Sequence, residues 1–147
     1  MRFSTRVRYG LRGLAELAEK HEKGPVLLKD ISRRQKISMK YLDHIFSLLK
    51  AKGLIKKEKA KRGGYLLARA PSEISLYDIV VALEGIDIME CLKSGPGCPL
   101  MQSCGVRIVW KQFEERFENL LRDFNLQDIL REKENLAKTQ GVYTYQI

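Results

Sequence analysis

Three cysteines crowd into one short segment and occur nowhere else in the 147-residue chain: Cys91, Cys98 and Cys104. The Gly and Pro residues among them are typical of a loop, which can fold over and bring the thiols together. In a reducing cytosol an odd set of thiols makes a poor disulfide framework, so these cysteines favour metal binding or redox chemistry. One intermolecular disulfide remains the alternative. We call residues 90–105 the cysteine segment.

Three thiolates can hold an iron-sulfur cluster, of the 2Fe-2S or the 4Fe-4S type, and leave one iron for a carboxylate, water or small molecule. Glu84, Asp87 and Glu90 are near in sequence, and Glu90 is the first candidate because it adjoins Cys91. Two other interpretations stay open. A zinc site would also need a fourth ligand and has no His nearby, and a bare thiol switch would oxidise to a sulfenate or disulfide.

The net charge of +9 is concentrated in the first half of the chain. Up to Arg69 there are nineteen Lys and Arg against six Asp and Glu, whereas from Ala70 onward there are eight against twelve. Positive charge on one module suits contact with phosphates and release of counterions, so double-stranded DNA is the expected partner. A merely solvated basic face, or attraction to anionic lipid, is the alternative.

The sequence lacks the patterns of common enzyme sites. It has no phosphate-binding glycine loop, no nucleophile elbow and no Cys/His pair at a recognisable spacing, so we expect no enzyme. No apolar run approaches the roughly 18 residues of a membrane span, and the basic start is not followed by a secretory apolar core. We therefore expect a cytoplasmic protein without a membrane partner.

The first half has the pattern of a helix-turn-helix. An apolar stripe after the capping residue Ser4 predicts a helix to about Lys23, where Gly24-Pro25 ends it. A short helix over 28–35 and a third over 38–52 follow, and the third buries Leu and Ile while exposing polar residues, as a recognition helix does. Its expected DNA contacts are Ser38, Lys40, Tyr41, Asp43 and His44.

A cationic hairpin is expected next. Residues 54–59 alternate as a strand, residues 60–64 form a turn, and residues 65–68 return. Its positive tip suits a wing that lies along the phosphate backbone or probes the minor groove, with Lys59, Lys61 and Arg62 as contacts. An ordinary charged strand edge is the alternative.

A long aromatic helix is expected after the cysteine segment. Ser75, with Asp78 three residues later, caps a linking helix before the segment, and an apolar stripe runs for about five turns after Gly105. This helix is too apolar to stand alone, so we expect a homodimer whose recognition helices lie about 34 Å apart on a pseudo-palindromic site. The expected interface residues are Trp110, Phe113, Phe117, Leu120, Leu121 and Phe124.

The expected fold is mainly α with a small β-hairpin wing. Asn125 is expected to cap a last helix over 126–137, and residues 141–147 are expected to form an extended tail. The expected units are a winged helix-turn-helix domain over 1–70, a linking helix and cysteine-bearing loop over 71–104, and a dimerisation helix with a C-terminal helix and tail over 105–147.

Three stretches carry a resemblance to a known family: MRFSTRVRYG at 1–10, ISMKYLDHIFSLLK at 37–50 and GGYLL at 63–67. They resemble the Rrf-two family of bacterial winged-helix regulators, which includes the iron-sulfur regulator IscR, the nitric-oxide sensor NsrR, the iron regulator RirA and the cysteine-metabolism repressor CymR. The resemblance covers nearly the whole chain. It implies a homodimer with an N-terminal DNA-binding domain, a long crossing helix and, in cluster-bearing members, three cysteines before that helix.

The chain departs from the family pattern at several positions. IscR-like and NsrR-like proteins usually have five residues in each gap between cysteines, whereas the gaps here hold six and five. The histidine that completes the IscR-like site falls at Arg107, and the acidic residue that NsrR-like proteins offer from the partner's first helix falls at Arg8. The IscR-like pattern has Ser, Glu and Gln at the positions of Lys40, Asp43 and His44, which implies a different DNA target.

These features predict a homodimeric transcriptional regulator, a repressor, whose affinity for a palindromic operator is controlled by an iron-sulfur cluster on the three cysteines. The signal would be iron-sulfur or iron status, oxygen or nitric oxide, and cluster-assembly proteins are candidate partners. The first alternative is a cluster-free, CymR-like or thiol-switch regulator of sulfur and cysteine metabolism. From another class, the alternative is an iron-sulfur or persulfide carrier.

Overall fold

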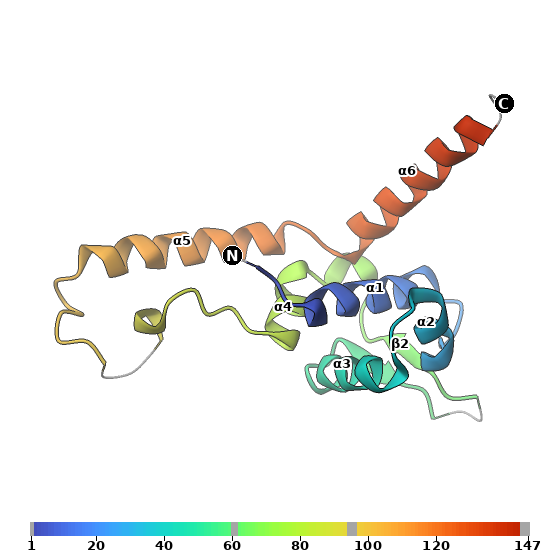
Figure 1. Cartoon of the computed structure of the whole chain (residues 1–147), viewed down its shortest axis with the longest axis horizontal. Helices are drawn as coiled ribbons and strands as arrows, with labels where there is room; N and C mark the ends of the chain where they lie inside the picture. Colours follow the sequence, from blue (N-terminus) through green and yellow to red (C-terminus); the bar gives the residue numbers. More distant parts are fainter. Residues whose placement is uncertain (1, 60–61, 94–96, 145–147) are drawn as a thin grey trace.

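The computed structural model describes residues 2–59, 62–93 and 97–144, with side chains described as far as Gly141. Its helices are α1 (Thr5–Glu19), α2 (Leu28–Gln35), α3 (Met39–Ala51), α4 (Leu76–Leu83), α5 (Gly105–Arg122) and α6 (Leu126–Thr144), with short 3-10 turns η1 (Pro71–Glu73) and η2 (Glu90–Leu92). Strands β1 (Ile55–Lys57) and β2 (Tyr65–Leu67) pair antiparallel. The chain is therefore mainly α with a small hairpin, as predicted (Figure 1).

Three helix starts agree with the capping residues in the sequence, whereas Ser4 precedes α1 without a side-chain cap hydrogen bond. The Ser38 hydroxyl accepts a hydrogen bond from a backbone N–H in the first turn of α3. At the start of α4, Asp78 N–H donates to the Ser75 hydroxyl and Ser75 N–H donates to the Asp78 carboxylate. Asn125 and Asp128 make the same reciprocal pair at the start of α6. Each pair satisfies N–H groups that the helix itself cannot.

Two helix ends differ from the sequence-based expectation. Helix α1 ends at Glu19 and not at about Lys23, because the chain turns there and Glu22 adopts the left-handed conformation with φ 68°. Helix α6 continues to Thr144, so the extended tail predicted for 141–147 is wrong for residues 141–144. A single helical glycine such as Gly141 costs only about 1 kcal/mol, which the helix tolerates. Residues 145–147 lie outside the described part of the chain.

Two glycines let α1 pack closely against its neighbours. A Cβ at Gly13 would lie 2.7 Å from Cε1 of Phe46 in α3, and a Cβ at Gly10 would lie 2.4 Å from Cδ1 of Leu83 in α4. No real side chain fits at such distances, so the glycines set the separation of the helices. Helix α1 thereby fixes both the recognition helix α3 and the linking helix α4.

A third short segment pairs with the outer edge of the hairpin. Ile55 pairs with Leu67 at the base of the two strands. Val26, which follows α1, exchanges backbone hydrogen bonds of 3.0 and 2.8 Å with Tyr65. The aromatic ring of Tyr65 packs edge-on against Phe46 at 5.0 Å. The wing is thus fastened to the recognition helix, although its strands are shorter than the predicted 54–59 and 65–68.

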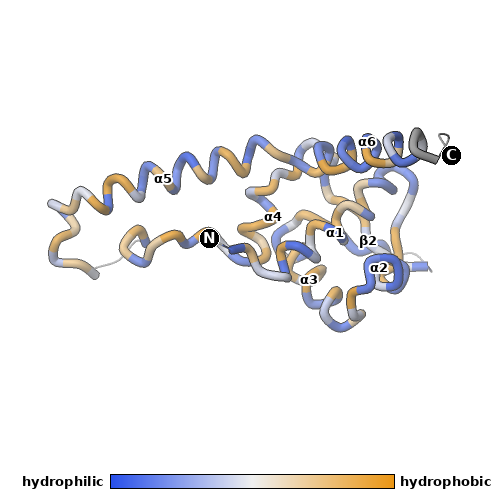
Figure 2. Tube along the Cα trace, turned by 45° about the horizontal axis from the view of Figure 1, so that its top comes forward, coloured by the Kyte–Doolittle hydropathy of each residue, from blue (hydrophilic) through white to orange (hydrophobic). Residues whose placement is uncertain are grey.

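The core lies in the N-terminal body formed by α1–α4 and the hairpin. Most buried apolar side chains lie between Val7 and Leu83, and Leu121 and Leu126 are the later ones among the described residues. Leu126 N–H donates to the Ile74 carbonyl, which ties the start of α6 to the body. Figure 2 shows α5 running away from this body with apolar residues along its length, and the cysteine segment lies at its far end.

Across residues 2–59, 62–93 and 97–144, no helix combines the length and apolar character needed to cross a membrane.

Candidate nucleic-acid interface and cysteine segment

Helix α3 presents a polar face to solvent. Its apolar side chains Leu42, Ile45 and Leu49 are fully buried. Lys40, Asp43 and His44 are exposed, as the sequence predicts, and the cap residue Ser38 is exposed at the same end. These side chains are free to meet base edges and phosphates.

Tyr41 differs from the other predicted DNA contacts because it is half-buried. Its ring lies edge-on to Tyr9 of α1 at 5.9 Å. Two arginines of α1 flank Tyr9, with the guanidinium carbons of Arg8 and Arg12 at 5.2 and 5.6 Å from the ring centre. Arg12 also donates to the main-chain carbonyl of Gln35 at 2.7 Å. Tyr41 therefore orients the start of α3, and the arginines add positive charge beside it.

Sequence reasoning did not place Arg8 and Arg12 beside the start of the recognition helix. Their spacing of four residues places them on one face of α1. That spacing, beside an aromatic residue, was the available signal.

Exposed cations lie on both sides of the turn at the tip of the wing. Lys59 and Arg62 are exposed, whereas Lys61 lies outside the described residues. Burial, and to a lesser degree the nearby Asp43 carboxylate, raises the pKa of Tyr65 at the start of β2. Tyr65 therefore stays neutral at physiological pH and serves as a packing anchor for the wing.

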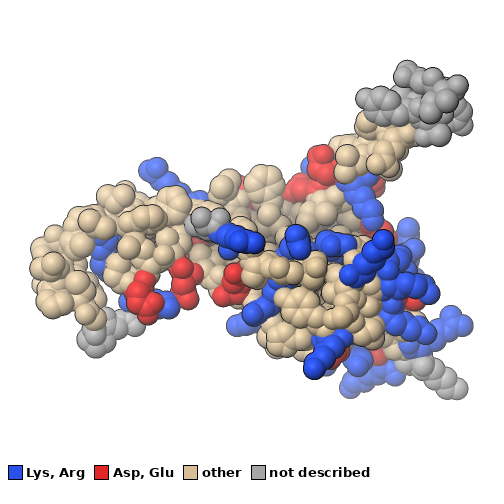
Figure 3. Space-filling model, in the orientation of Figure 1, with Lys and Arg blue, Asp and Glu red and all other residues tan. Residues whose placement is uncertain are grey.

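The two ends of the molecule differ in the charge of their surfaces. In Figure 3 the Lys and Arg side chains gather over the N-terminal body, around α2, α3 and the hairpin, whereas the far end of α5 is mostly uncharged. A strongly cationic body, joined to an arm that carries charges of both signs, is suited to phosphate contact at the body.

The structure brings two of the three cysteines to one cavity. Cys91 lies in η2 and is half-buried, Cys98 is exposed, and Cys104 is half-buried as the residue that precedes α5. A cavity of about 220 Å³ is lined by Cys91, Cys98 and the candidate ligand Glu90, but not by Cys104. Among the described residues, no three His, Cys, Asp or Glu side chains come close enough to hold a metal ion. The thiols suit an iron-sulfur cluster by chemical type, and Cys104 must approach to complete the set.

Arg107 ties the cysteine segment to α5. Its Nε donates a hydrogen bond of 3.1 Å to the main-chain carbonyl of Cys91, sixteen residues earlier in the chain. Arg107 is in the first turn of α5, whose N-cap is Cys104. The residue at the position of the IscR-like histidine therefore links the turns that carry two of the cysteines. Sequence reasoning identified the position but not this contact, which depends on the fold of the segment.

Glu90 is engaged with a cation. Lys93 Nζ lies 3.3 Å from a Glu90 oxygen and 3.4 Å from an Asp87 oxygen. The hydrogen bond that Lys93 donates to Glu90, followed by the one it donates to Asp87, raises the pKa of Lys93. Glu90 would have to leave Lys93 before it could bind iron, and exposed ion pairs of this kind are weak enough to allow that.

The predicted interface residues on α5 divide into exposed and covered ones. Trp110, Phe113, Leu120 and Phe124 are large apolar residues with 37–53% of their surface exposed. Phe117 is half-buried and stacks on Phe3 at 6.3 Å. Leu121, also predicted at the interface, is only 7% exposed within the single chain. Its side chain is covered because α5 packs against the body at this end.

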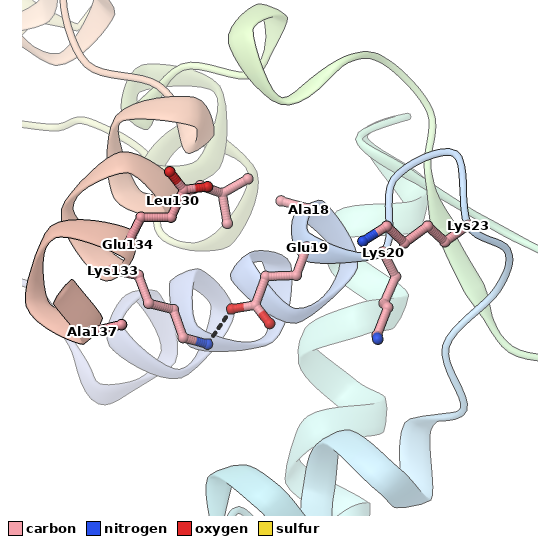
Figure 4. A pocket seen from close by; sticks show the side chains of 8 residues that line it. All are labelled: Ala18, Glu19, Lys20, Lys23, Leu130, Lys133, Glu134 and Ala137. Atoms are coloured by element: carbon pink, nitrogen blue, oxygen red, sulfur yellow. Dashed lines mark hydrogen bonds and ion pairs between the residues drawn. The ribbon is translucent and has the colours of Figure 1, made fainter. Parts of the chain in front are cut away.

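The contacts of α1 with α6 and α2 are structural in character. Figure 4 shows Lys133 of α6 reaching Glu19 of α1 across a cavity of about 400 Å³. On another side of α1, Glu16 is 6% exposed and accepts hydrogen bonds from Arg34 and Gln35. Burial would raise the pKa of Glu16, but these two hydrogen bonds outweigh it and hold the pKa below its ordinary value.

A helix-turn-helix with an exposed polar recognition helix, a hairpin fastened beside it and a cationic surface define a winged-helix DNA-binding protein. Residues 3–132 match the model of the Rrf2 family, described as an iron-dependent transcriptional regulator. The chain belongs to this family, which is the Rrf-two family of the resemblance above. Members of the family are transcriptional regulators, so the protein is a DNA-binding regulator and not an enzyme.

Individual relatives agree with this assignment. The chain is 37% identical over 133 residues to the protein named rrf2 of Nitratidesulfovibrio vulgaris, covering 90% of this chain and 89% of that one. It is 34% identical to the regulator IscR of Klebsiella pneumoniae, covering 92% and 83%. Among solved structures, T. potens IscR superimposes with a TM-score of 0.70 at 30% identity, covering 92% and 90%. The B. subtilis global cysteine regulator CymR superimposes with a TM-score of 0.68 at 32% identity, covering 88% and 95%.

Proposed function

We propose that the protein is a homodimeric regulator that binds a palindromic DNA operator, and that an iron-sulfur cluster on Cys91, Cys98 and Cys104 controls this binding. The observation that carries the proposal is the position of the cysteine segment between two helices. Before it comes α4, which packs on the recognition helix, and after it comes α5, which exposes an apolar face to a second copy.

The DNA contacts in this proposal come from α3 and the wing. Asp43 can accept a hydrogen bond from a cytosine amino group, and His44 can donate to a guanine or a phosphate. Lys40, together with Lys59, Lys61 and Arg62 of the wing, would position the protein on the phosphates. Ser38 and Tyr41 would hold the start of α3 in register on the duplex.

The cluster would supply a labile, redox-active iron centre at the cysteine segment. The chain's own residues give this site its connection to the fold. Cys104 precedes α5 directly, so drawing its thiol toward the cavity would move the first turn of that helix. Arg107 would move with it and pull on the main chain of Cys91. Glu90, released by Lys93, is the proposed fourth ligand.

Contacts then lead from α5 to the DNA-binding face. Helix α5 packs against α4, which packs against both α1 and α3. At the end of α4, Glu84 accepts hydrogen bonds of 3.2 and 3.1 Å from Ser4, and the Leu83 carbonyl accepts one of 2.8 Å from Arg6. A shift of α4 would thus be felt at the start of α1 and at the recognition helix, which is the two-site coupling that allostery requires.

The proposed signal is iron-sulfur or iron status, oxygen or nitric oxide, and the proposed outcome is repression. The protein would act in the cytoplasm, where it meets the operator and cluster-assembly proteins. A second candidate, a cluster-free, CymR-like or thiol-switch regulator, is favoured by one observation: the cavity beside η2 has two cysteines in its lining and not three. An iron-sulfur or persulfide carrier would bind DNA without a preferred sequence.

Anaerobic purification with a visible spectrum and iron and sulfide analysis tests the cluster. We expect broad absorbance near 400 nm with iron and sulfide in matching amounts, all lost in Cys98→Ala and retained in the nearby control Ser103→Ala. A colourless, iron-free native protein that still binds DNA as a dimer would refute the cluster and favour the thiol-switch regulator.

Operator selection followed by fluorescence anisotropy at fixed salt tests the regulation. We expect cluster-loaded and cluster-free protein to differ in affinity for the selected palindrome by about 5-fold to 150-fold, the usual range of allosteric coupling. Equal affinity of the two forms would contradict control by the cluster. Equal affinity for the palindrome and for random DNA would instead favour the carrier.

A further inference from the structure

The cavity beside η2 has a sulfur-rich lining that the iron-sulfur proposal leaves partly unused. Its lining residues are Glu90, Cys91, Lys93, Gly97, Cys98 and Met101. They include two thiols and one thioether, whereas Cys104, which the iron-sulfur cluster needs, is not among them. The thioether of Met101 has no role in a cluster held by three cysteines.

Two hydrogen-bonded turns bring these sulfur atoms to the same cavity. Met101 N–H donates to the Cys98 carbonyl at 3.1 Å, which closes a turn whose second residue is Pro99. Proline fixes φ near the value that this turn position requires. On the other side, Cys91 lies within the single 3-10 turn η2, closed by Lys93 N–H donating to the Glu90 carbonyl at 3.2 Å. The cavity is therefore built from locally determined backbone and not from loose side chains alone.

The possible metal ligands in this lining are a hard carboxylate oxygen and soft sulfur atoms. The Glu90 carboxylate, the oxygen donor in the lining, is paired with Lys93 at 3.3 Å. This leaves two thiols and a thioether, and such sulfur ligands suit soft ions, of which copper(I) is one that a cell provides. The cavity is also partly sheltered, since Cys91 and Met101 are half-buried.

We propose that this cavity binds a single cuprous ion when the iron-sulfur cluster is absent, with the thiolates of Cys91 and Cys98 and the thioether of Met101 as ligands. Binding exchanges two thiol protons for one Cu⁺, so the site gains one negative charge overall, and neither copper nor sulfur changes oxidation state. The ammonium group of Lys93, in the same lining, offsets part of that charge.

The cuprous site would share two thiols with the proposed cluster, so the two would exclude each other. Cys104 distinguishes the two sites, because the cluster requires it and the cuprous ion does not. Met101 distinguishes them in the opposite way, because the cuprous ion requires it and the cluster does not. The cuprous site therefore stands or falls independently of the regulator's iron-sulfur cluster.

Titration of the full chain, reduced and freed of iron, with tetrakis(acetonitrile)copper(I) against the competitor bicinchoninate under nitrogen tests the proposal. We expect one cuprous ion per chain, with unchanged affinity in Cys104→Ser and affinity lower by at least about tenfold in Met101→Leu. Cys98→Ser should lose the site. Met39→Leu, which changes an exposed methionine of α3, is the matched control and should bind as the native chain does.

Two results would overturn the proposal. If Cys104→Ser weakened binding as much as Cys98→Ser, the ion would be held by three thiols and not by this cavity. If Met101→Leu bound copper(I) with native affinity, the thioether would not be a ligand. Circular dichroism shows whether Met101→Leu, which keeps the side-chain size, retains the fold. Iron and sulfide analysis of the same variants decides the cluster separately.

Discussion

The N-terminal body and helix α5 differ in where they place their apolar side chains. In the body, Leu14, Ile31 and Phe46 are fully buried, and the helices approach each other over glycines. In α5, Val109 is 64% exposed, and Leu121 is the buried residue of the helix. The body completes its own core, whereas α5 exposes an apolar face that a monomer does not cover.

The two regions therefore meet different structural requirements. The body must hold the recognition helix and wing in a fixed arrangement, so its contacts are internal and close-packed. The arm formed by α5 and the cysteine segment has few internal contacts, so its arrangement can respond to a partner, a cluster or a metal ion.

The largest effect is expected from a charge placed on the exposed apolar face of α5. In Phe113→Glu, burial of a carboxylate against a second copy would oppose dimerisation, and we expect a monomer by analytical ultracentrifugation. DNA affinity should fall roughly 100-fold or more, because the avidity of two half-sites is lost. Lys111→Glu, on another part of the same helix, is the control and should remain dimeric. A dimeric Phe113→Glu protein would show that this face is not the interface.

Adding one methyl group in the body should cost more than adding it in α6. Gly13→Ala places a carbon 2.7 Å from Phe46 Cε1, and we expect it to lower the free energy of unfolding by about 1–3 kcal/mol. Gly141→Ala, where a Cβ meets nothing within 4 Å, should instead raise the free energy of unfolding by up to about 1 kcal/mol. Urea denaturation measures both changes. Equal effects would mean that α1 is not close-packed against α3.

Protonation should remove one polar contact of the body. The folded state lowers the pKa of Glu16 below its ordinary value of 4.5, so its ionised form contributes stability above that pH, and the contribution is lost as pH falls through the folded pKa. Glu16→Gln should therefore cost about 1–2 kcal/mol at pH 7 and progressively less below pH 4.5. Glu115→Gln, an exposed residue of α5, should show no such dependence. Thermal unfolding across pH 3–7 makes the measurement.

The smallest effect is expected at the wing. Arg62→Ala should lower DNA affinity roughly fivefold at 0.1 M salt and reduce the salt slope by about 1, because one phosphate contact is lost. Lys138→Ala in α6 has the same change of charge away from the body and should leave both quantities unchanged. An unaltered salt slope in Arg62→Ala would mean that the wing does not lie on the phosphate backbone.

Local patterns predicted much of the fold. The capping residues Ser38 and Ser75 marked helix starts correctly because a cap acts on N–H groups within the next turn. The exposed face of α3 followed from helical periodicity in the same way. The predicted end of the last helix, at residue 137, was wrong because Gly141 is a weak local signal for termination, and the helix continues through it.

The candidate site was predictable in composition but not in arrangement. The sequence identified Cys91, Cys98, Cys104 and Glu90 as possible ligands. It did not reveal that Arg107 bonds the Cys91 carbonyl, sixteen residues earlier in the chain. Contacts between residues many positions apart depend on how turns and helices meet, which residue types alone do not encode.

The sequence by itself determined the family, the positions of most elements and the set of sulfur donors, because short-range periodicity, capping and residue chemistry decide these. Only the tertiary structure decided which sulfur atoms share a cavity, that Leu121 is covered within the chain, and that α1 approaches α3 and α4 over Gly13 and Gly10. Those properties arise from packing between distant segments, where excluded volume and solvent exposure act on the whole fold.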